Sequence, residues 1–224
     1  MFAEFYHNSI RKTVTGFGTL FNNIFITRSN GMGNTQRIKV PLTYSNKEKF
    51  IHRLSVSLAD LENQQTQITL PRLSFSLTNV AYDPERKKNS IVRRFRTEVD
   101  TNNTDINKYH FSNIPYNLEF TLSIYTRNTD DGIQIVEQIL PFFTPEFTIT
   151  IKPDILGDTD EKLDIPIVLT QVTPTEISEG MLSTEATRLI TWDLTFTAKT
   201  MVYGPVKDVG LIKHIEANFF HLED

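Results

Sequence analysis

Histidines and acidic residues are the side chains here that could bind a metal ion or carry acid–base chemistry. The five histidines are far apart in the sequence, at His7, His52, His110, His214 and His221. Only His214 and His221 are near each other, with Glu216 between them. Metal ligands that lie close in a sequence are usually separated by fewer residues than these two histidines. The chain has no cysteine, which excludes thiol catalysis, disulfides and thiolate ligands. We therefore name no catalytic and no metal-binding residue.

Four polar residues fit the starts of helices better than they fit catalysis. Asp130 and Asp131 form a carboxylate pair that could serve acid–base chemistry. They precede an apolar stripe with helical spacing, however, where capping side chains and negative charge stabilise the helix N-terminus. Ser45 and Glu48 have the spacing of a capping box, in which each side chain binds a free backbone N–H near the other residue. We predict that all four cap helices.

The glycine pairs complete no nucleotide-binding or hydrolase motif. Gly16-Phe17-Gly18 and Gly31-Met32-Gly33 are too short for GxGxxG, and no GK[ST] or GxSxG sequence is present. No cofactor-binding residue can be named, and we expect that the chain is not an enzyme.

The densest charge is a basic cluster, made up of Arg86, Lys87, Lys88, Arg93, Arg94 and Arg96. Such a cluster can contact phosphate or an acidic protein surface. It can also discourage edge-to-edge aggregation of a solvated strand. Because the net charge of the chain is −4, we favour a protein contact or a protected edge over nucleic acid.

Length and composition suit one globular domain over residues 1–224. Hydrophobic residues make up 39% of the chain and aromatic residues 11%, enough for a sizeable core. The N-terminus lacks the continuous apolar region of a secretory signal. No apolar run approaches the ~20 residues that cross a bilayer, so we expect no membrane partner.

Three segments show helical periodicity, at about residues 2–22, 46–58 and 129–140. Two glycines weaken the first of them. The third carries an apolar stripe made up of Ile133, Val136, Ile139 and Leu140. We expect this stripe to pack in the core and the helix to end at Pro141, which lacks a backbone N–H.

Alternating apolar and polar residues predict strands along most of the remaining chain. They are expected at about 37–43, 70–82, 118–125, 147–151, 165–169 and 190–198. The first closes a hairpin around a turn at 29–34, and a slip in the alternation at Asn79 predicts a bulge. Residues 83–115 are polar and are predicted to form a long hairpin arm or loop. This pattern indicates an α+β fold with a mainly antiparallel sheet flanked by a few helices.

Several short stretches carry a resemblance to a known family. They are NS at 8–9, LFNNI at 20–24, IKVPLTY at 38–44, LPR at 70–72, SIYTR at 123–127, Asp130-Asp131, QIVEQILP at 134–141, ITWDLTF at 190–196 and YGPV at 203–206. Residues 135–141 are the most specific, whereas 83–115 and the residues after Val206 carry little. Together these stretches resemble the tail sheath stabiliser and completion proteins (tail terminators) of T-even-type contractile-tailed phages.

The resemblance implies a structural virion protein that forms a hexameric ring at the head-proximal end of a contractile tail. Such a ring terminates and stabilises the sheath and tube and docks the tail to the neck. The implied partners are further copies of the chain, the tail sheath protein, the tail tube or tube-terminator protein, and neck or head-completion proteins. DNA would be met at most in the lumen. Assembly would occur in the host cytoplasm, without a cofactor.

Other functions stay open on the sequence. The chain could be another ring component of the neck or tube terminus, or a nucleic-acid-binding module that uses the basic cluster. A hydrolase with a scattered site has no residue constellation in its favour. If the chain is a terminator, it could hold the sheath by strand pairing at a sheet edge, at 90–97 or 145–151. The sequence does not tell which strands are edges.

Overall fold

The computed structural model describes residues 4–30, 34–59, 69–99, 105–153, 162–177 and 189–209. These residues form the predicted α+β fold with mainly antiparallel sheets. The helices are α1 (Ser9–Leu20), α2 (Lys47–Ala59) and α3 (Thr129–Ile139), and α3 continues into the 3-10 turn η1 (Leu140–Phe142). None of the described helices is long and apolar enough to cross a membrane.

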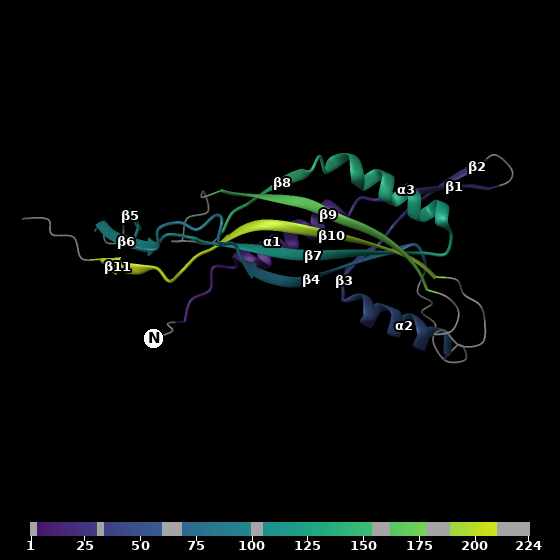
Figure 1. Ribbon diagram of the computed structural model, residues 1–224, viewed down its shortest axis with the longest axis horizontal. Helices are drawn as coiled ribbons and strands as arrows, with labels where there is room; N and C mark the ends of the chain where they lie inside the picture. Colours follow the sequence, from purple (N-terminus) through teal and green to yellow (C-terminus); the bar gives the residue numbers. More distant parts are fainter. Residues whose placement is uncertain are drawn as a thin grey trace, which may run out of the picture.

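A six-stranded sheet forms the body of the molecule, with strand order β3-β4-β7-β10-β9-β8 (Figure 1). Its strands are β3 (Leu42–Tyr44), β4 (Arg72–Tyr82), β7 (Ile114–Thr126), β8 (Glu146–Ile151), β9 (Leu163–Ile177) and β10 (Leu189–Val202). β3 pairs parallel with β4, and the other pairs are antiparallel. The central strands β7 and β10 pair along almost their whole length, so they form the backbone of the sheet.

Two smaller sheets extend from the body. β1 (Phe25–Asn30) and β2 (Asn34–Lys39) form the predicted hairpin. β5 (Arg93–Val99) and β6 (Asp105–Phe111) form a second hairpin within the polar stretch 83–115, and β11 (Lys207–Val209) pairs with β6. We call the sheet of β5, β6 and β11 the arm. Figure 1 shows the arm at one end of the body and the β1–β2 hairpin at the other.

The core lies on the face of the six-stranded sheet that α1 and α3 cover. Phe17 of α1 is fully buried and stacks on Phe120 of β7, with ring centroids 4.4 Å apart. Phe75 of β4 and Phe196 of β10 pack around the same ring, at 5.5 and 5.3 Å. α3 adds three buried aliphatic side chains, which are Ile135, Val136 and Ile139. The aromatic cluster around Phe17 therefore fixes α1 on the centre of the sheet.

Two glycines allow α1 to approach the sheet closely. A Cβ atom on Gly18 would lie 2.8 Å from Cζ of Phe75, and one on Gly16 would lie 3.0 Å from Cδ1 of Ile149. A side chain at either position would displace its neighbour. By helix propensity alone, both glycines weaken the helix. The packing against Phe75 nevertheless requires a residue without a side chain at position 18.

The opposite face of the sheet is more polar, and α2 packs against it. Phe50 of α2 stacks on Tyr125 of β7 at 4.1 Å between centroids. The hydroxyls of Tyr125 and Ser74 share a hydrogen bond of 3.0 Å. Burial raises the pKa of Tyr125, so it stays a neutral hydroxyl. Lys47 of α2 forms an ion pair with Asp193 of β10. An aromatic stack and an ion pair thus attach α2 to the sheet.

The bulge and most strand positions are confirmed, but three details of the prediction are wrong. The β4–β7 register shifts between Leu77 and Asn79, where the alternation slips. α1 begins at Ser9 instead of residue 2, because Asn8 takes a left-handed conformation with φ of 55°. The strand expected at 37–43 is split between β2 and β3, which belong to different sheets. β9 runs on to Ile177, into a stretch predicted as loop.

Candidate interaction surfaces

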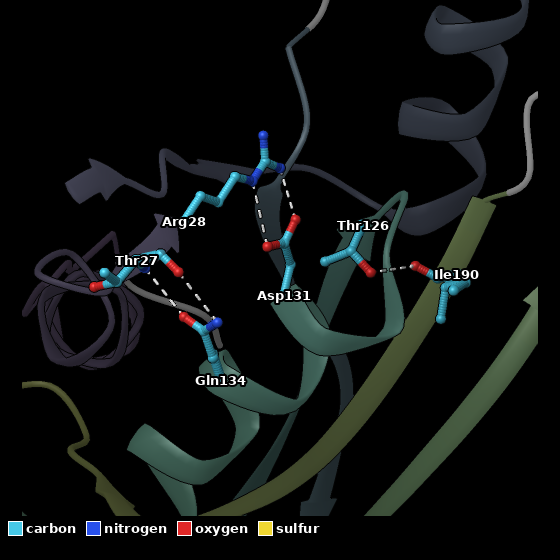
Figure 2. A network of polar contacts seen from close by, with 6 residues as sticks. All are labelled: Thr27, Arg28, Thr126, Asp131, Gln134 and Ile190. Atoms are coloured by element: carbon cyan, nitrogen blue, oxygen red, sulfur yellow. Dashed lines mark hydrogen bonds and ion pairs between the residues drawn. The ribbon is translucent and has the colours of Figure 1, made fainter. Parts of the chain in front are cut away.

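Side chains of α3 attach the β1–β2 hairpin to the body (Figure 2). The carboxylate of Asp131 is 4% exposed and accepts hydrogen bonds from Arg28 Nη2 at 2.6 Å and Nε at 3.4 Å. The Gln134 amide accepts a bond from the Thr27 N–H at 3.0 Å and donates one to the Thr27 carbonyl at 3.3 Å. Gln138 donates to the carbonyl of Phe25 at 2.7 Å. The glutamines thus bond the backbone of β1 much as a neighbouring strand would.

This geometry corrects the role predicted for the acidic pair. The N-cap of α3 is Asn128, and its side chain makes no capping bond. Asp130 and Asp131 lie two and three residues after this N-cap, in the first turn, where negative charge still stabilises a helix. The Asp131 carboxylate binds Arg28 instead of a helix N–H. The hydrogen bond to Asp131 raises the pKa of Arg28, so the guanidinium stays protonated.

The predicted capping box at α2 is not formed in the described structure. α2 begins at Lys47, and the Ser45 hydroxyl donates to the carbonyl of Asn46 at 3.3 Å instead of accepting a helix N–H. Glu48 lies in the first turn, where its charge suits the helix dipole. The spacing of Ser45 and Glu48 predicted the start of α2 correctly, but it did not predict the hydrogen bonds that form there.

The basic cluster does not form one patch, and Arg86 belongs to an internal network. Its Nε donates to Asp83 at 2.6 Å, and its Nη2 donates to Asn117 at 2.7 Å. The hydrogen bond from Arg86 lowers the pKa of Asp83. Lys87 and Lys88 are exposed in the loop before β5. Arg86 thus fixes the start of the polar stretch instead of offering a free positive charge.

The remaining arginines of the cluster lie on β5. Arg93 and Arg94 are both exposed, and as neighbours on a strand they point to opposite faces of the arm. The side chain of Arg96 lies outside what the structure describes. The cluster therefore offers positive charge on both faces of the arm.

One face of the arm is aromatic and open to solvent. The strand register places Arg93 opposite Phe111 and Phe95 opposite Tyr109. The Arg93 guanidinium lies over both aromatic rings of β6, 5.1 Å from the Tyr109 centroid and 5.8 Å from that of Phe111. Phe95 is 63% exposed. We call these four residues the aromatic face of the arm.

The opposite face of the arm is partly covered. His110 is buried, and its ring lies edge-on to Tyr203 with centroids 6.0 Å apart. Tyr203 in turn packs with Met201 and Val206, which precede β11. The arm is therefore asymmetric, with one partly covered face and one face of rings that other molecules can reach.

An apolar groove lies between the C-terminal ends of α1 and α3. It has a volume of about 640 Å³, and none of its lining residues is basic. Its lining residues are Leu20, Phe21, Asn23, Ile24, Glu137, Gln138, Ile139, Pro141, Phe142, Phe143 and Phe147. Phe142 is 64% exposed. The groove thus combines several aromatic side chains with one carboxylate, that of Glu137.

The apolar stripe predicted for α3 is partly wrong. Val136 and Ile139 are buried as expected, but Ile133 and Leu140 are each 40% exposed. Ile135, which the prediction left out, is fully buried. The side of α3 that faces the sheet is rotated toward Ile135, so Ile133 and Leu140 remain on the outer surface of the helix.

Both segments considered for strand pairing contain strands at sheet edges. β8 is the last strand of the six-stranded sheet, and β5 is the last strand of the arm. Within the described residues each pairs with one neighbour only, so each has a row of backbone N–H and C=O groups on its open side.

A sheet with an open aromatic arm, an apolar groove and two strand edges that have no second neighbour among the described residues is typical of a subunit that binds other proteins in an assembly. The model of the T4-like virus Myoviridae tail sheath stabiliser family matches residues 4–224. The tail completion protein gp15 of Enterobacteria phage T4 is 35% identical over 223 residues, covering 98% of this chain and 79% of that protein. The chain belongs to this tail sheath stabiliser family, and it is a structural protein of a contractile phage tail.

Proposed function

We propose that six copies of this chain form a ring at the head-proximal end of the tail. The ring terminates the sheath and tube and offers the neck a surface to dock on. The observation that carries the proposal is the 35% identity to a tail completion protein across 98% of the chain. In this proposal the chain assembles in the host cytoplasm and has no enzymatic activity.

A terminator of this kind needs two types of contact. Side-to-side contacts between copies must be heterologous and must close on themselves, because an open arrangement would keep polymerising. Contacts along the tail axis must hold sheath subunits, and an unpaired strand edge can do this through backbone hydrogen bonds. The open edges of β8 and β5 meet the second requirement.

The nucleic-acid alternative has less support in the structure than in the sequence. Arg86 is bonded to Asp83 and Asn117, and Arg93 and Arg94 lie on opposite faces of β5. A phosphate backbone would therefore meet only part of the basic cluster at once.

Native mass measurement of the purified chain, followed by electron microscopy with polymerised sheath, tests the proposed ring. We expect six copies per particle and a cap at one end of the sheath. If the chain binds purified tube or neck protein but not sheath, it is a different ring component of the tail.

A proline scan along 146–151 of β8 and 93–99 of β5 tests strand pairing. Only every second backbone N–H of an edge strand points to the open side, so the inward positions of the same strand serve as controls. Among variants that fold by circular dichroism, sheath capping should be lost at alternate positions of one edge. Normal capping by all folded variants would rule out strand addition at both.

A further inference from the structure

The aromatic face of the arm and the apolar groove both leave large apolar side chains in water. Phe95 on the arm is 63% exposed, and Phe142 at the groove is 64% exposed. Exposed apolar side chains that gather in one patch typically mark a contact with another protein. Neither surface is covered by another part of the chain that the structure describes.

The two surfaces carry opposite charges. On the aromatic face, Arg93 lies over the rings, and the register places the exposed Lys207 of β11 opposite Tyr109. At the groove, the exposed Glu137 forms part of the wall, and the exposed Glu146 precedes Phe147 in β8. A cationic aromatic face and an acidic apolar groove are complementary, and such complementarity fixes both partner and orientation.

The two surfaces also occupy different parts of the molecule. The arm extends beyond one end of the six-stranded sheet, whereas α3 and η1 lie along the body (Figure 1). A contact between the arm of one copy and the groove of another joins unlike surfaces, so it is heterologous and can repeat around a ring.

We infer that the aromatic face of the arm of one copy docks in the apolar groove of the next copy, with Arg93 facing Glu137. The inference rests on the proposed ring and identifies the contact that closes it. Phe95 is the apolar anchor of this contact, because it is the most exposed ring of the aromatic face.

Cross-linking tests the contact directly, because the natural chain has no cysteine. The double variant Lys207→Cys with Asn23→Cys places one thiol beside the aromatic face, opposite Tyr109, and one at the groove, and it keeps Phe95 and Phe142. A short bismaleimide should yield a ladder of covalent oligomers up to the size of the ring. Either single variant should yield dimers at most. Tyr44→Cys with Asn23→Cys, whose first thiol lies on β3 at the far edge of the sheet, should yield no ladder.

The outcomes separate this inference from the proposed function. A ring that forms by native mass but yields no ladder overturns the arm-to-groove contact and leaves the ring standing. A chain that forms no ring alone and does not cap sheath overturns both.

A charge exchange tests the pairing of Arg93 with Glu137. Arg93→Glu and Glu137→Arg should each raise the concentration at half-assembly about tenfold, and the double variant should recover most of that loss. Arg94→Glu, on the opposite face of β5, should assemble like the wild type. Equal weakening by Arg94→Glu, or no recovery in the double variant, would overturn the pairing. Sedimentation velocity over a concentration series measures the assembly of all four variants.

Discussion

Two of the aromatic clusters that the structure describes have very different surroundings. In the six-stranded body, Phe17 is fully buried among Phe75, Phe120 and Phe196. In the arm, the rings of one face lie beneath an arginine, and Phe95 remains 63% exposed. The rings of the body stabilise the fold, whereas those of the arm are available to another molecule. Substitutions in the body should therefore change stability, and substitutions in the arm should change assembly.

The most direct test of this difference is to remove one ring from each region. Phe17→Ala should lower the free energy of unfolding by about 3–5 kcal/mol, because it opens a cavity at the centre of the core. Phe95→Ala should change it by less than about 0.5 kcal/mol. Urea denaturation of the two variants measures both values. A comparable loss from Phe95→Ala would mean that the arm rings are part of the fold's stability.

The second prediction concerns close packing in the body. A Cβ atom on Gly132 of α3 would lie 2.6 Å from Nε1 of Trp192, so Gly132→Ala should cost about 1–3 kcal/mol. Helix propensity alone predicts the opposite sign. Trp192 is the only tryptophan, so its fluorescence reports the displacement while urea denaturation gives the cost. Gly204→Ala, with no atom within 4 Å of the added Cβ, is the matched control and should be close to neutral.

The third prediction concerns the β1–β2 hairpin. Asp131→Asn should lower the free energy of unfolding by about 1–2 kcal/mol, because it weakens the hydrogen-bonded ion pair with Arg28. The loss is limited because the Arg28 side chain is 41% exposed and water screens the pair. Hydrogen exchange should rise in β1 and β2 and stay unchanged in β9. Asp130→Asn, one residue earlier in the same turn, is the control and should leave exchange in the hairpin as it is. Equal exchange in both variants would contradict a specific role for Asp131.

The smallest effect is expected at the loop that leads into the arm. Arg86 lowers the pKa of Asp83 in the folded state, so the ionised carboxylate favours folding. That contribution is complete above the unfolded-state pKa and is lost as the pH falls through the lower folded-state pKa. Asp83→Asn should therefore be less stable than the wild type at neutral pH, and this difference in stability should shrink as the pH falls into the acid range. Urea denaturation at neutral and at acidic pH, with Glu85→Gln as control, measures the difference in stability between variant and wild type. If that difference stays the same in acid, the effect does not come from the charge of Asp83.

Features encoded within a few residues were predictable from the sequence. The alternation of β7 and β10, the slip at Asn79 and the end of α3 before Pro141 each depend on neighbours in the chain. These features were sufficient for the fold class. The single-domain assignment over 1–224 stays a prediction.

Contacts between distant segments were not predictable. Asp131 had the spacing of a helix cap, but its partner Arg28 lies 103 residues away in the sequence. The apolar side chains of α3 allow two helical phases, and only packing on the sheet selects Ile135 over Ile133. The aromatic face of the arm was missed for the same reason. Phe95 and Tyr109 are ordinary strand residues until the register places them side by side.

The arm is connected to the body by three strands that are adjacent in the sheet. β4 ends, β7 begins and β10 ends at the side of the body from which the arm extends (Figure 1). A force that pulls on the arm is therefore directed along these strands, not across them. Because all three strands are pulled together, the force must shear the hydrogen bonds that join them to the rest of the sheet, such as the β10–β9 ladder, together instead of unzipping them one by one. The geometry suits a part that keeps its shape under tension when a tail contracts.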